Sequence, residues 1–151
     1  MKSIFFICFS FLLIQGIQAQ EALKTFTDIA ASKTYAAENN QDILMVFAGS
    51  DWCKPCIQFK KDILQSTDFI DQLGEQVNVL YLDFPARRKN RLSKEQTAHN
   101  EGLAERFNKS GAFPKIVLID KDEQVLATPS FKGQTALDFI HELTPALKTE
   151  K

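Results

Sequence analysis

A pair of cysteines directly behind a short apolar run most restricts what this chain can fold into. The run ILMVFA, residues 43–48, is unbroken and predicts a strand buried on both faces of a sheet. Gly49 ends the run, and Cys53 and Cys56 follow within SDWCKPC, residues 50–56. From Cys53 onward the apolar spacing becomes helical, so we expect the pair where a strand ends and a helix begins. Open α/β sheets carry their functional sites at such strand ends.

The rest of the chain alternates helical and strand patterns without a repeat or a linker, which predicts one domain. Helices are expected over residues 22–38, from Cys53 onward, and over 68–73, 101–107 and 136–147, and strands over 43–48, 77–84, 115–120 and 125–128. Strands joined through helices should be parallel, whereas the last two strands form an antiparallel hairpin. The predicted fold class is α/β, with a central mixed sheet flanked by helices on both faces.

The first 19 residues have the pattern of a cleaved secretory signal peptide. Lys2 is followed by the apolar stretch IFFICFSFLLI, residues 4–14, and by a short polar segment that ends at Ala19. A membrane anchor would need about 20 apolar residues, and this stretch has roughly half that number. A buried helix is a second alternative, and lipid modification of Cys8 is a third. Lipid-modified cysteines resemble one another in following a small residue, whereas the residue before Cys8 is bulky. We expect a periplasmic or secreted domain, residues 20–151, without a stable membrane anchor after cleavage.

The charge of the chain excludes one class of partner, and its compartment bears on its chemistry. The formal net charge is -1 and becomes -2 when the segment that carries Lys2 is removed. Such a near-neutral domain lacks the excess of positive charge that would indicate binding to nucleic acid. Outside the cytosol, two thiols so close together become oxidised unless a partner keeps them reduced.

The spacing of the cysteines suits reversible disulfide chemistry. A thiol at a helix N-terminus lies among unpaired N–H groups at the positive end of the helix dipole, which favours the thiolate. Cys53 has this position and is the expected nucleophile, and Cys56, on the same helix face, is the expected resolving thiol. Lys54 adds a cation and Pro55 suits the first helical turn, so these two residues are expected to tune the pKa of the pair.

Two other uses of a cysteine pair are less well supported. A structural zinc site needs about four ligands, and the predicted domain adds only His99 and His141, without ligand spacing. A disulfide that closes so short a loop removes little entropy from the unfolded chain, which makes a purely structural bridge a poor use of this spacing. We therefore predict no metal and no prosthetic group.

A Phe-Pro dipeptide precedes the apolar run KIVLID, residues 115–120. Proline at a strand entry often marks a turn. A cis bond between Phe113 and Pro114 would instead leave the backbone of Phe113 free to meet an extended peptide beside the cysteines. The sequence does not decide between the two isomers.

WCKPC behind a strand, followed about sixty residues later by FPKIVLID, a hairpin and a final helix, resembles the thioredoxin superfamily over nearly all of the predicted domain. With LDFP, a basic tract and NEGLAERF, the chain is similar to exported thioredoxin-like proteins of bacteria, especially those of Bacteroidetes. The resemblance implies a thiol–disulfide oxidoreductase acting on extracytoplasmic proteins, with Cys53 as nucleophile and Cys56 as resolving thiol. It also implies that Pro114 is a cis-proline opposite the pair and that Trp52 and Phe113 contribute to substrate recognition.

Two departures from the family pattern leave the direction of electron flow open. Cytosolic thioredoxins carry a buried Asp where this chain has Phe47. The carboxylate that helps to deprotonate the resolving thiol is therefore absent, unless Asp51 or a water molecule substitutes for it. The residues between the cysteines are Lys-Pro instead of Gly-Pro. A reductase served by a membrane-bound thiol reductant, an oxidase and an isomerase all remain compatible with the pair, as does a non-catalytic peptide-binding or chaperone module.

One basic tract is not explained by the redox motif. It lies between the second predicted strand and the following helix, and its cations are Arg87, Arg88, Lys89, Arg91 and Lys94. Such a run is usually a solvated surface loop that leads into a helix, and the alternative is a docking patch.

Overall fold

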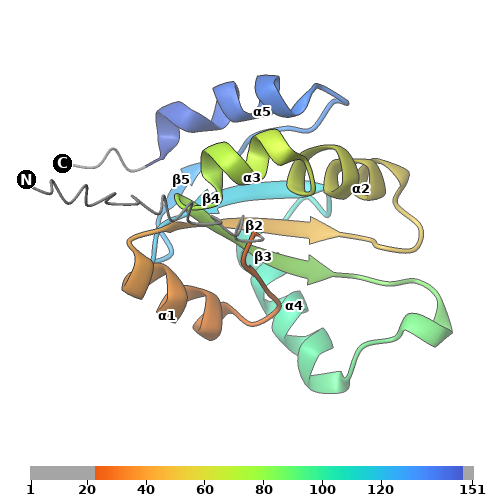
Figure 1. The fold of residues 1–151 in the computed structure, drawn as a ribbon. Helices are drawn as coiled ribbons and strands as arrows, with labels where there is room; N and C mark the ends of the chain where they lie inside the picture. Colours follow the sequence, from red (N-terminus) through yellow and green to blue (C-terminus); the bar gives the residue numbers. More distant parts are fainter. Residues whose placement is uncertain (1–22, 148–151) are drawn as a thin grey trace, which may run out of the picture.

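A five-stranded sheet with helices on both faces makes up the fold (Figure 1). The computed structural model describes residues 23–147, so the predicted signal peptide, residues 1–19, lies outside the described part. The strands, in the spatial order β1-β3-β2-β4-β5, are β1 (Thr25–Phe26), β2 (Asp42–Ala48), β3 (Val77–Asp83), β4 (Lys115–Ile119) and β5 (Val125–Ala127). The helices are α1 (Ile29–Asn39), α2 (Lys54–Phe59), α3 (Thr67–Leu73), α4 (Lys94–Phe107) and α5 (Ala136–Leu143). The predicted α/β class and the mixed sheet are confirmed.

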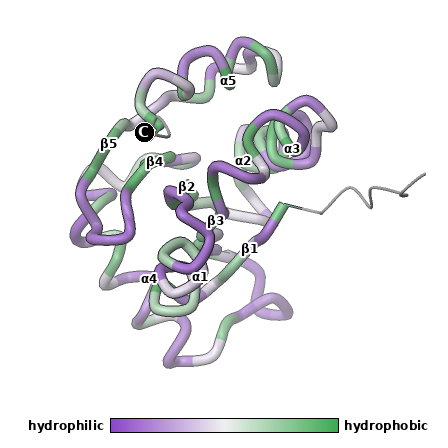
Figure 2. Tube along the Cα trace, turned by 60° about the vertical axis from the view of Figure 1, so that its left-hand side comes forward, coloured by the Kyte–Doolittle hydropathy of each residue, from purple (hydrophilic) through white to green (hydrophobic). Residues whose placement is uncertain are grey.

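The central strand β2 separates two apolar cores, because successive side chains of a strand point to opposite faces. Leu44, Val46 and Ala48 pack on the side of α2, α3 and α5, and Ile43, Met45 and Phe47 pack on the side of α1 and α4. All six residues of the predicted run, 43–48, are buried in β2, and Asp42 before them is buried as well. The helices alternate hydrophilic and hydrophobic residues along the chain, as expected for elements with only one face on the sheet (Figure 2).

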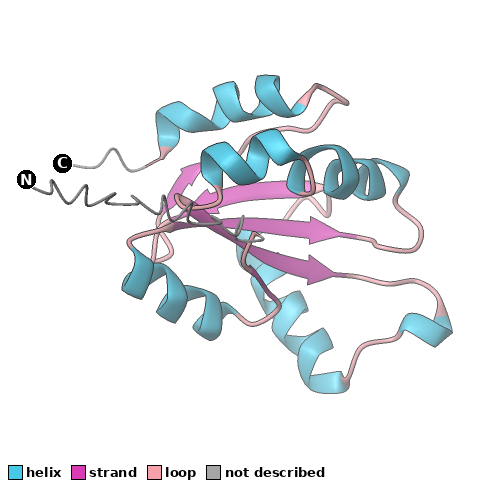
Figure 3. Cartoon of the chain, viewed as in Figure 1, coloured by secondary structure: helices cyan, strands magenta, loops and turns pink. Residues whose placement is uncertain are grey.

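The direction of β4 differs from the prediction. β2 and β3 are parallel, as expected, but β4 runs antiparallel to β2 although a helix precedes it (Figure 3). Lys115, the first residue of β4, pairs with Phe47 near the carboxyl end of β2. The connection through α4 therefore brings the chain back to the end of the sheet where β2 and β3 finish, and not to the end where they begin. The rule that helix-linked strands are parallel fails here, because the connection that contains α4 begins and ends at the same end of the sheet.

Several element boundaries also differ from the prediction, and side-chain caps explain two of them. The helix predicted from residue 22 begins only at Ile29, where Asp28 accepts a hydrogen bond from the N–H of Ala31, and the preceding Thr25–Phe26 pairs with β3 as an edge strand. The helix predicted from residue 101 begins at Lys94, because Ser93 caps it by accepting from the N–H of Gln96.

Two predicted helices change geometry before their expected ends. The helix that begins after Cys53 is α-helical over Lys54–Phe59 and continues as a π-helical turn over Lys60–Leu64. The last helix ends at Leu143 and passes into a 3₁₀ turn over Thr144–Ala146, which holds a proline in its first turn.

The side chain of Tyr81 in β3 is expected to make stability depend on pH in alkaline solution. Burial, and then the negative charge of Asp83, raises the pKa of Tyr81 to about 12, compared with about 10 in an unfolded chain. The neutral phenol is therefore favoured by folding, so its contribution to stability is complete below about pH 10 and is lost as the pH rises towards 12.

Urea unfolding of the parent and of Tyr81→Phe between pH 9 and 12 measures this effect. The free energy of unfolding of the parent should fall relative to that of the variant as the pH passes 10, because other titrating groups are shared by both proteins. A difference that stays constant over this range would contradict the assignment.

Candidate active site

The turn that follows β2 places the cysteine pair at the start of α2. Cys53 is the N-cap of this helix, and its sulfur accepts a hydrogen bond from the N–H of Cys56 at 3.2 Å. The N–H of Cys53 donates to the carbonyl of Gly49 at 3.0 Å, which closes the turn. The predicted junction between a strand and a helix is confirmed.

Cys53 and Cys56 form a disulfide, and both residues are buried. Cys53 is 4% exposed and Cys56 1%, so the two sulfurs differ little in exposure in the oxidised protein. The pair belongs to the apolar core beneath α2, α3 and α5. A partner that reaches the sulfurs must therefore approach over the side chains around them. Lys54 and Pro55, the two residues between the cysteines, are exposed in the first turn of α2.

Aromatic side chains form the surface beside the disulfide. The indole of Trp52 is 48% exposed, and its Nε1 donates a hydrogen bond of 2.7 Å to the carbonyl of Phe84. The rings of Trp52 and Phe113 meet edge to face at 5.3 Å, and the ring of Phe113 meets that of Phe84 in the same way at 5.4 Å. Ile57, in α2, is also 48% exposed. These contacts hold Trp52 in one orientation with an open face.

The chain enters β4 next to this aromatic surface. The peptide bond between Phe113 and Pro114 is cis, which answers the question that the sequence left open. Phe113 packs against the core that holds the disulfide, and the following Lys115 pairs with Phe47 at the carboxyl end of β2. The antiparallel direction of β4 is what brings this dipeptide to the edge of the sheet that carries the cysteines.

Asp51 does not take the place of the family's buried Asp. Its carboxylate accepts hydrogen bonds from the N–H groups of Ala86 and Arg87 and from the side chain of Asn90, at 2.8–3.0 Å. Burial works to raise the pKa of Asp51, but these three hydrogen bonds outweigh burial and hold the pKa below its ordinary value. Phe47, at the position of the missing Asp, is buried in the core on the α1 and α4 side.

Sequence reasoning missed Asp83, at the end of β3, which binds the turn between β2 and α2 that carries Cys53. Its two carboxylate oxygens accept from the N–H of Ser50 at 2.9 Å and from the hydroxyl of Ser50 at 2.6 Å. The LDFP stretch contains Asp83 and Phe84, but nothing in local spacing indicates that both residues contact the cysteine motif. His99 lies elsewhere, where its Nε2 accepts the N–H of Ile29 at 3.1 Å and so joins α4 to α1.

Replacing Gly49 by alanine is expected to displace Trp52. A methyl group at Gly49 would overlap the indole, which is anchored by its hydrogen bond to Phe84. Loss of that bond should lower the free energy of unfolding by about 1 kcal/mol. Because Trp52 is the sole tryptophan of the chain, its fluorescence spectrum reports the movement directly.

Gly102→Ala is the matched control for this substitution. A methyl group there would meet nothing within 4 Å, and Gly102 lies inside α4, where alanine is the better helix former. The control should leave the fluorescence spectrum unchanged and should not lower stability. An unchanged spectrum in Gly49→Ala would contradict the predicted displacement.

Within residues 23–147, no group of three His, Cys, Asp or Glu side chains is placed to hold a metal ion. Over the same residues, no helix is long and apolar enough to span a membrane.

Comparison with known proteins decides the family. Residues 29–141 match the family model of the thioredoxin-like domain. The chain belongs to this family. A disulfide bond reductase, DsbH from Chlamydia pneumoniae, is 31% identical over 119 residues, which cover 79% of this chain and 70% of the relative. With its bonded Cys53 and Cys56, this member of the thioredoxin superfamily is a thiol–disulfide oxidoreductase.

Solved structures agree with this assignment. A DsbH oxidoreductase has a TM-score of 0.77 at 28% identity, covering 91% of this chain and 94% of that chain. A disulphide isomerase from Xylella fastidiosa Temecula1 has a TM-score of 0.55 at 17% identity, covering 77% of this chain and 88% of that chain. The second likeness concerns the fold alone.

Proposed function

We propose that this thioredoxin-like protein reduces disulfides of other proteins outside the cytoplasm. The observation that carries the proposal is the Cys53–Cys56 disulfide at the start of α2, with the sulfur of Cys53 accepting the N–H of Cys56. The 31% identity to a protein named as a disulfide bond reductase supports reduction as the direction.

The proposed reaction transfers two electrons from the dithiol to a substrate disulfide. The thiolate of Cys53, favoured by the helix N-terminus, attacks one substrate sulfur, and the other substrate sulfur leaves as a thiolate that takes up a proton. Cys56 then loses its proton and attacks the sulfur of Cys53 in the mixed disulfide. This second step releases the first substrate sulfur as a thiol and leaves the Cys53–Cys56 disulfide. A dithiol donor must reduce that disulfide before the next cycle.

The substrate-binding surface in this proposal consists of the exposed side chains around the pair. Trp52 and Ile57 are each 48% exposed while the cysteines are nearly covered, so an incoming polypeptide would contact these apolar groups first. Phe113 and Pro114 border the same surface, which supports a role in positioning the substrate chain. Lys54 lies exposed in the first turn of α2, where its charge favours the thiolate form of Cys53.

We further propose export through the signal pattern of residues 1–19, which gives a periplasmic or secreted protein. In an oxidising compartment the dithiol form does not persist alone, so the donor has to be supplied there. A membrane-bound thiol reductant would meet this need, because it draws electrons from the cytoplasmic side.

Reduction of insulin tests the proposed function. The reduced protein should accelerate the precipitation of insulin chains by dithiothreitol, and the double variant Cys53→Ser/Cys56→Ser should not. Equal rates with both proteins would overturn the catalytic reading in favour of a peptide-binding module.

The reduction potential of the pair tests the direction of transfer. A reductase is expected to have a potential below that of its compartment, and about 30 mV changes the two-electron equilibrium tenfold. A potential well above that of the compartment would instead identify an oxidase.

A further inference from the structure

A cluster of exposed cations follows β3 and is linked by hydrogen bonds to Asp51 of the cysteine motif. Residues 87–94 hold five basic residues and no acidic one, in a chain whose net charge is -1. All five are exposed, and we call them the basic loop: Arg87, Arg88, Lys89, Arg91 and Lys94. The ion pairs formed among residues 23–147 involve none of the five, and Asp51 is the carboxylate whose charge acts on Arg87. These cations are therefore available to a ligand.

The basic loop is bound to the cysteine motif through Asp51, which accepts hydrogen bonds from the N–H of Arg87 and from the side chain of Asn90. The side chain and N–H of Ser50 bond to Asp83, Asp51 accepts from the loop backbone, and Trp52 donates to the carbonyl of Phe84. The bonds of Ser50 and Trp52 hold the same turn against the end of β3, from which the chain continues into the basic loop. The distance between the basic loop and the disulfide is consequently set by the fold and is not left to a free loop.

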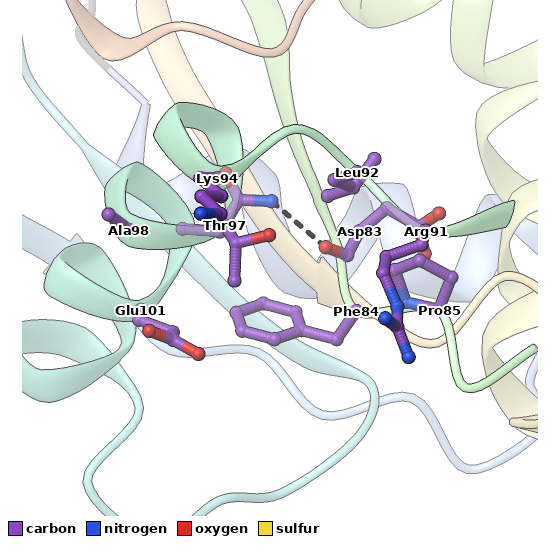
Figure 4. Close-up of a pocket in the computed structure, with 10 residues that line it drawn as sticks. Asp83, Phe84, Pro85, Arg91, Leu92, Lys94, Thr97, Ala98 and Glu101 are labelled. Atoms are coloured by element: carbon purple, nitrogen blue, oxygen red, sulfur yellow. Dashed lines mark hydrogen bonds between the residues drawn. The ribbon is translucent and has the colours of Figure 1, made fainter. Parts of the chain in front are cut away.

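A cavity of about 520 Å³ lies between the basic loop and α4 (Figure 4). The ring of Phe84 lies in the middle of its lining in this view, with Arg91 to one side and Lys94 to the other. The rest of the lining is apolar at Pro85, Leu92 and Ala98 and polar at Asp83, Thr97, Asn100 and Glu101. The side chain of Asn100 donates to the carbonyl of Asp83 at 2.9 Å, and this bond braces α4 against the end of β3.

Phe84 joins this cavity to the surface around the disulfide. Its carbonyl holds the indole of Trp52, and its ring packs on Phe113. A polypeptide that lies over Trp52 therefore needs only a short extension to reach the cavity, whose rim carries two cations and whose lining is largely apolar.

We propose that the cavity binds a segment of the substrate polypeptide in which an acidic side chain stands next to an apolar one. The carboxylate would pair with Arg91 or with Lys94, which lie on opposite sides of Phe84, so that a segment with an acidic residue on each side of the apolar one would engage both cations. The apolar side chain would pack against Phe84 and Leu92. This inference rests on the proposed reductase function and names the class of substrate that the site prefers. Two acidic residues also line the cavity, Glu101 and Asp83, and the carboxylate of Asp83 is bound to Ser50. Both have the same charge as the ligand, so they should weaken binding.

Two peptides with the same intramolecular disulfide test the inference. One carries Glu-Leu-Glu beside the disulfide, and the other carries Gln-Leu-Gln at the same place. The reduced parent protein should have a kcat/KM about tenfold higher for the acidic peptide, since two exposed ion pairs contribute modestly. This preference should shrink as salt is raised, because salt screens exposed charges.

Variants assign the preference to the cavity. In Arg91→Gln/Lys94→Gln the ratio of the two kcat/KM values should fall close to one, and in Glu101→Gln it should rise above that of the parent. Lys24→Gln/Lys61→Gln removes the same charge from exposed sites outside the cavity lining and should keep the parent ratio. A ratio near one in the parent, or a parent-like ratio in Arg91→Gln/Lys94→Gln, would overturn the inference.

Two further measurements separate the remaining outcomes. Reduction of hydroxyethyl disulfide, which is small and uncharged, tests the chemistry alone, so its absence in the parent would refute the proposed function itself. Cosedimentation with phosphatidylglycerol vesicles that is lost in Arg91→Gln/Lys94→Gln, together with a peptide ratio near one, would assign the basic loop to an anionic lipid surface and overturn the peptide site.

Discussion

Cys56→Ala is expected to accumulate substrate proteins bound covalently to Cys53, whereas Cys53→Ala is expected to accumulate none. The first sulfur forms the mixed disulfide and the second releases it, so removal of the second stops the reaction half-way. Cys53 caps α2 and accepts the N–H of Cys56, which gives it the position of the nucleophile. Turnover of insulin should fall by roughly three orders of magnitude or more in either variant, as when other catalytic nucleophiles are removed.

Trapping is measured by incubating each reduced variant with oxidised insulin, followed by non-reducing electrophoresis and mass spectrometry of the adducts. The double variant Cys53→Ala/Cys56→Ala is the control for adducts formed through other groups. Adducts on Cys56 in Cys53→Ala, at the level seen on Cys53 in the reciprocal variant, would reverse the assigned roles.

Phe139→Ala is expected to cause the largest loss of stability among single substitutions in α5. Phe139 is fully buried, and its ring meets that of Phe59 edge to face at 5.2 Å and lies 6.3 Å from that of Phe69. It therefore joins α5 to the helices α2 and α3 in the core that also holds the disulfide. Truncation of a buried phenylalanine to alanine typically costs about 3–5 kcal/mol.

Urea unfolding of the oxidised protein measures this loss, with Leu137→Ala as the matched control. Leu137 lies two positions earlier in the same helix and is 54% exposed, so its truncation should change the free energy of unfolding by less than about 0.5 kcal/mol. Similar effects of the two substitutions would show that α5 does not depend on the Phe139 contact.

Much of the fold was predictable because its signals are local. The run at residues 43–48 is β2, the alternation after Val77 is β3, and the apolar spacing after Ala136 is α5. In each case the spacing of the apolar residues predicts which face of the strand or helix is buried. The junction that carries Cys53 and Cys56 follows from the same patterns, since the period changes within a few residues of Gly49.

The missed features depend on residues far apart in the chain. Thr25–Phe26 has no strand signal of its own and is a strand only because β3 pairs with it. The early start of α4 could have been recognised, because Ser93 and the following Glu and Gln are a helix-start pattern, but the charges of the basic tract suggested a loop.

The contacts of Asp51 and Asp83 across the turn have no local signature. Each carboxylate joins the turn after β2 to the end of β3 or the loop after it, and its partner lies more than thirty positions away along the chain. Spacing rules do not reach such pairs, so sequence reasoning considered Asp51 only as a partner of the thiols.

Local sequence patterns are enough to place two cysteines at the start of a helix behind a buried strand, because periodicity and helix-terminal chemistry depend on residues only a few positions apart. The point at which β4 enters the sheet depends on the folded chain as a whole. Its antiparallel direction brings Phe113 and Pro114 to the edge that carries the disulfide, whereas a parallel strand would have begun at the opposite edge. Strand direction depends on the path of the whole connection through α4, and that path is set by packing between distant residues.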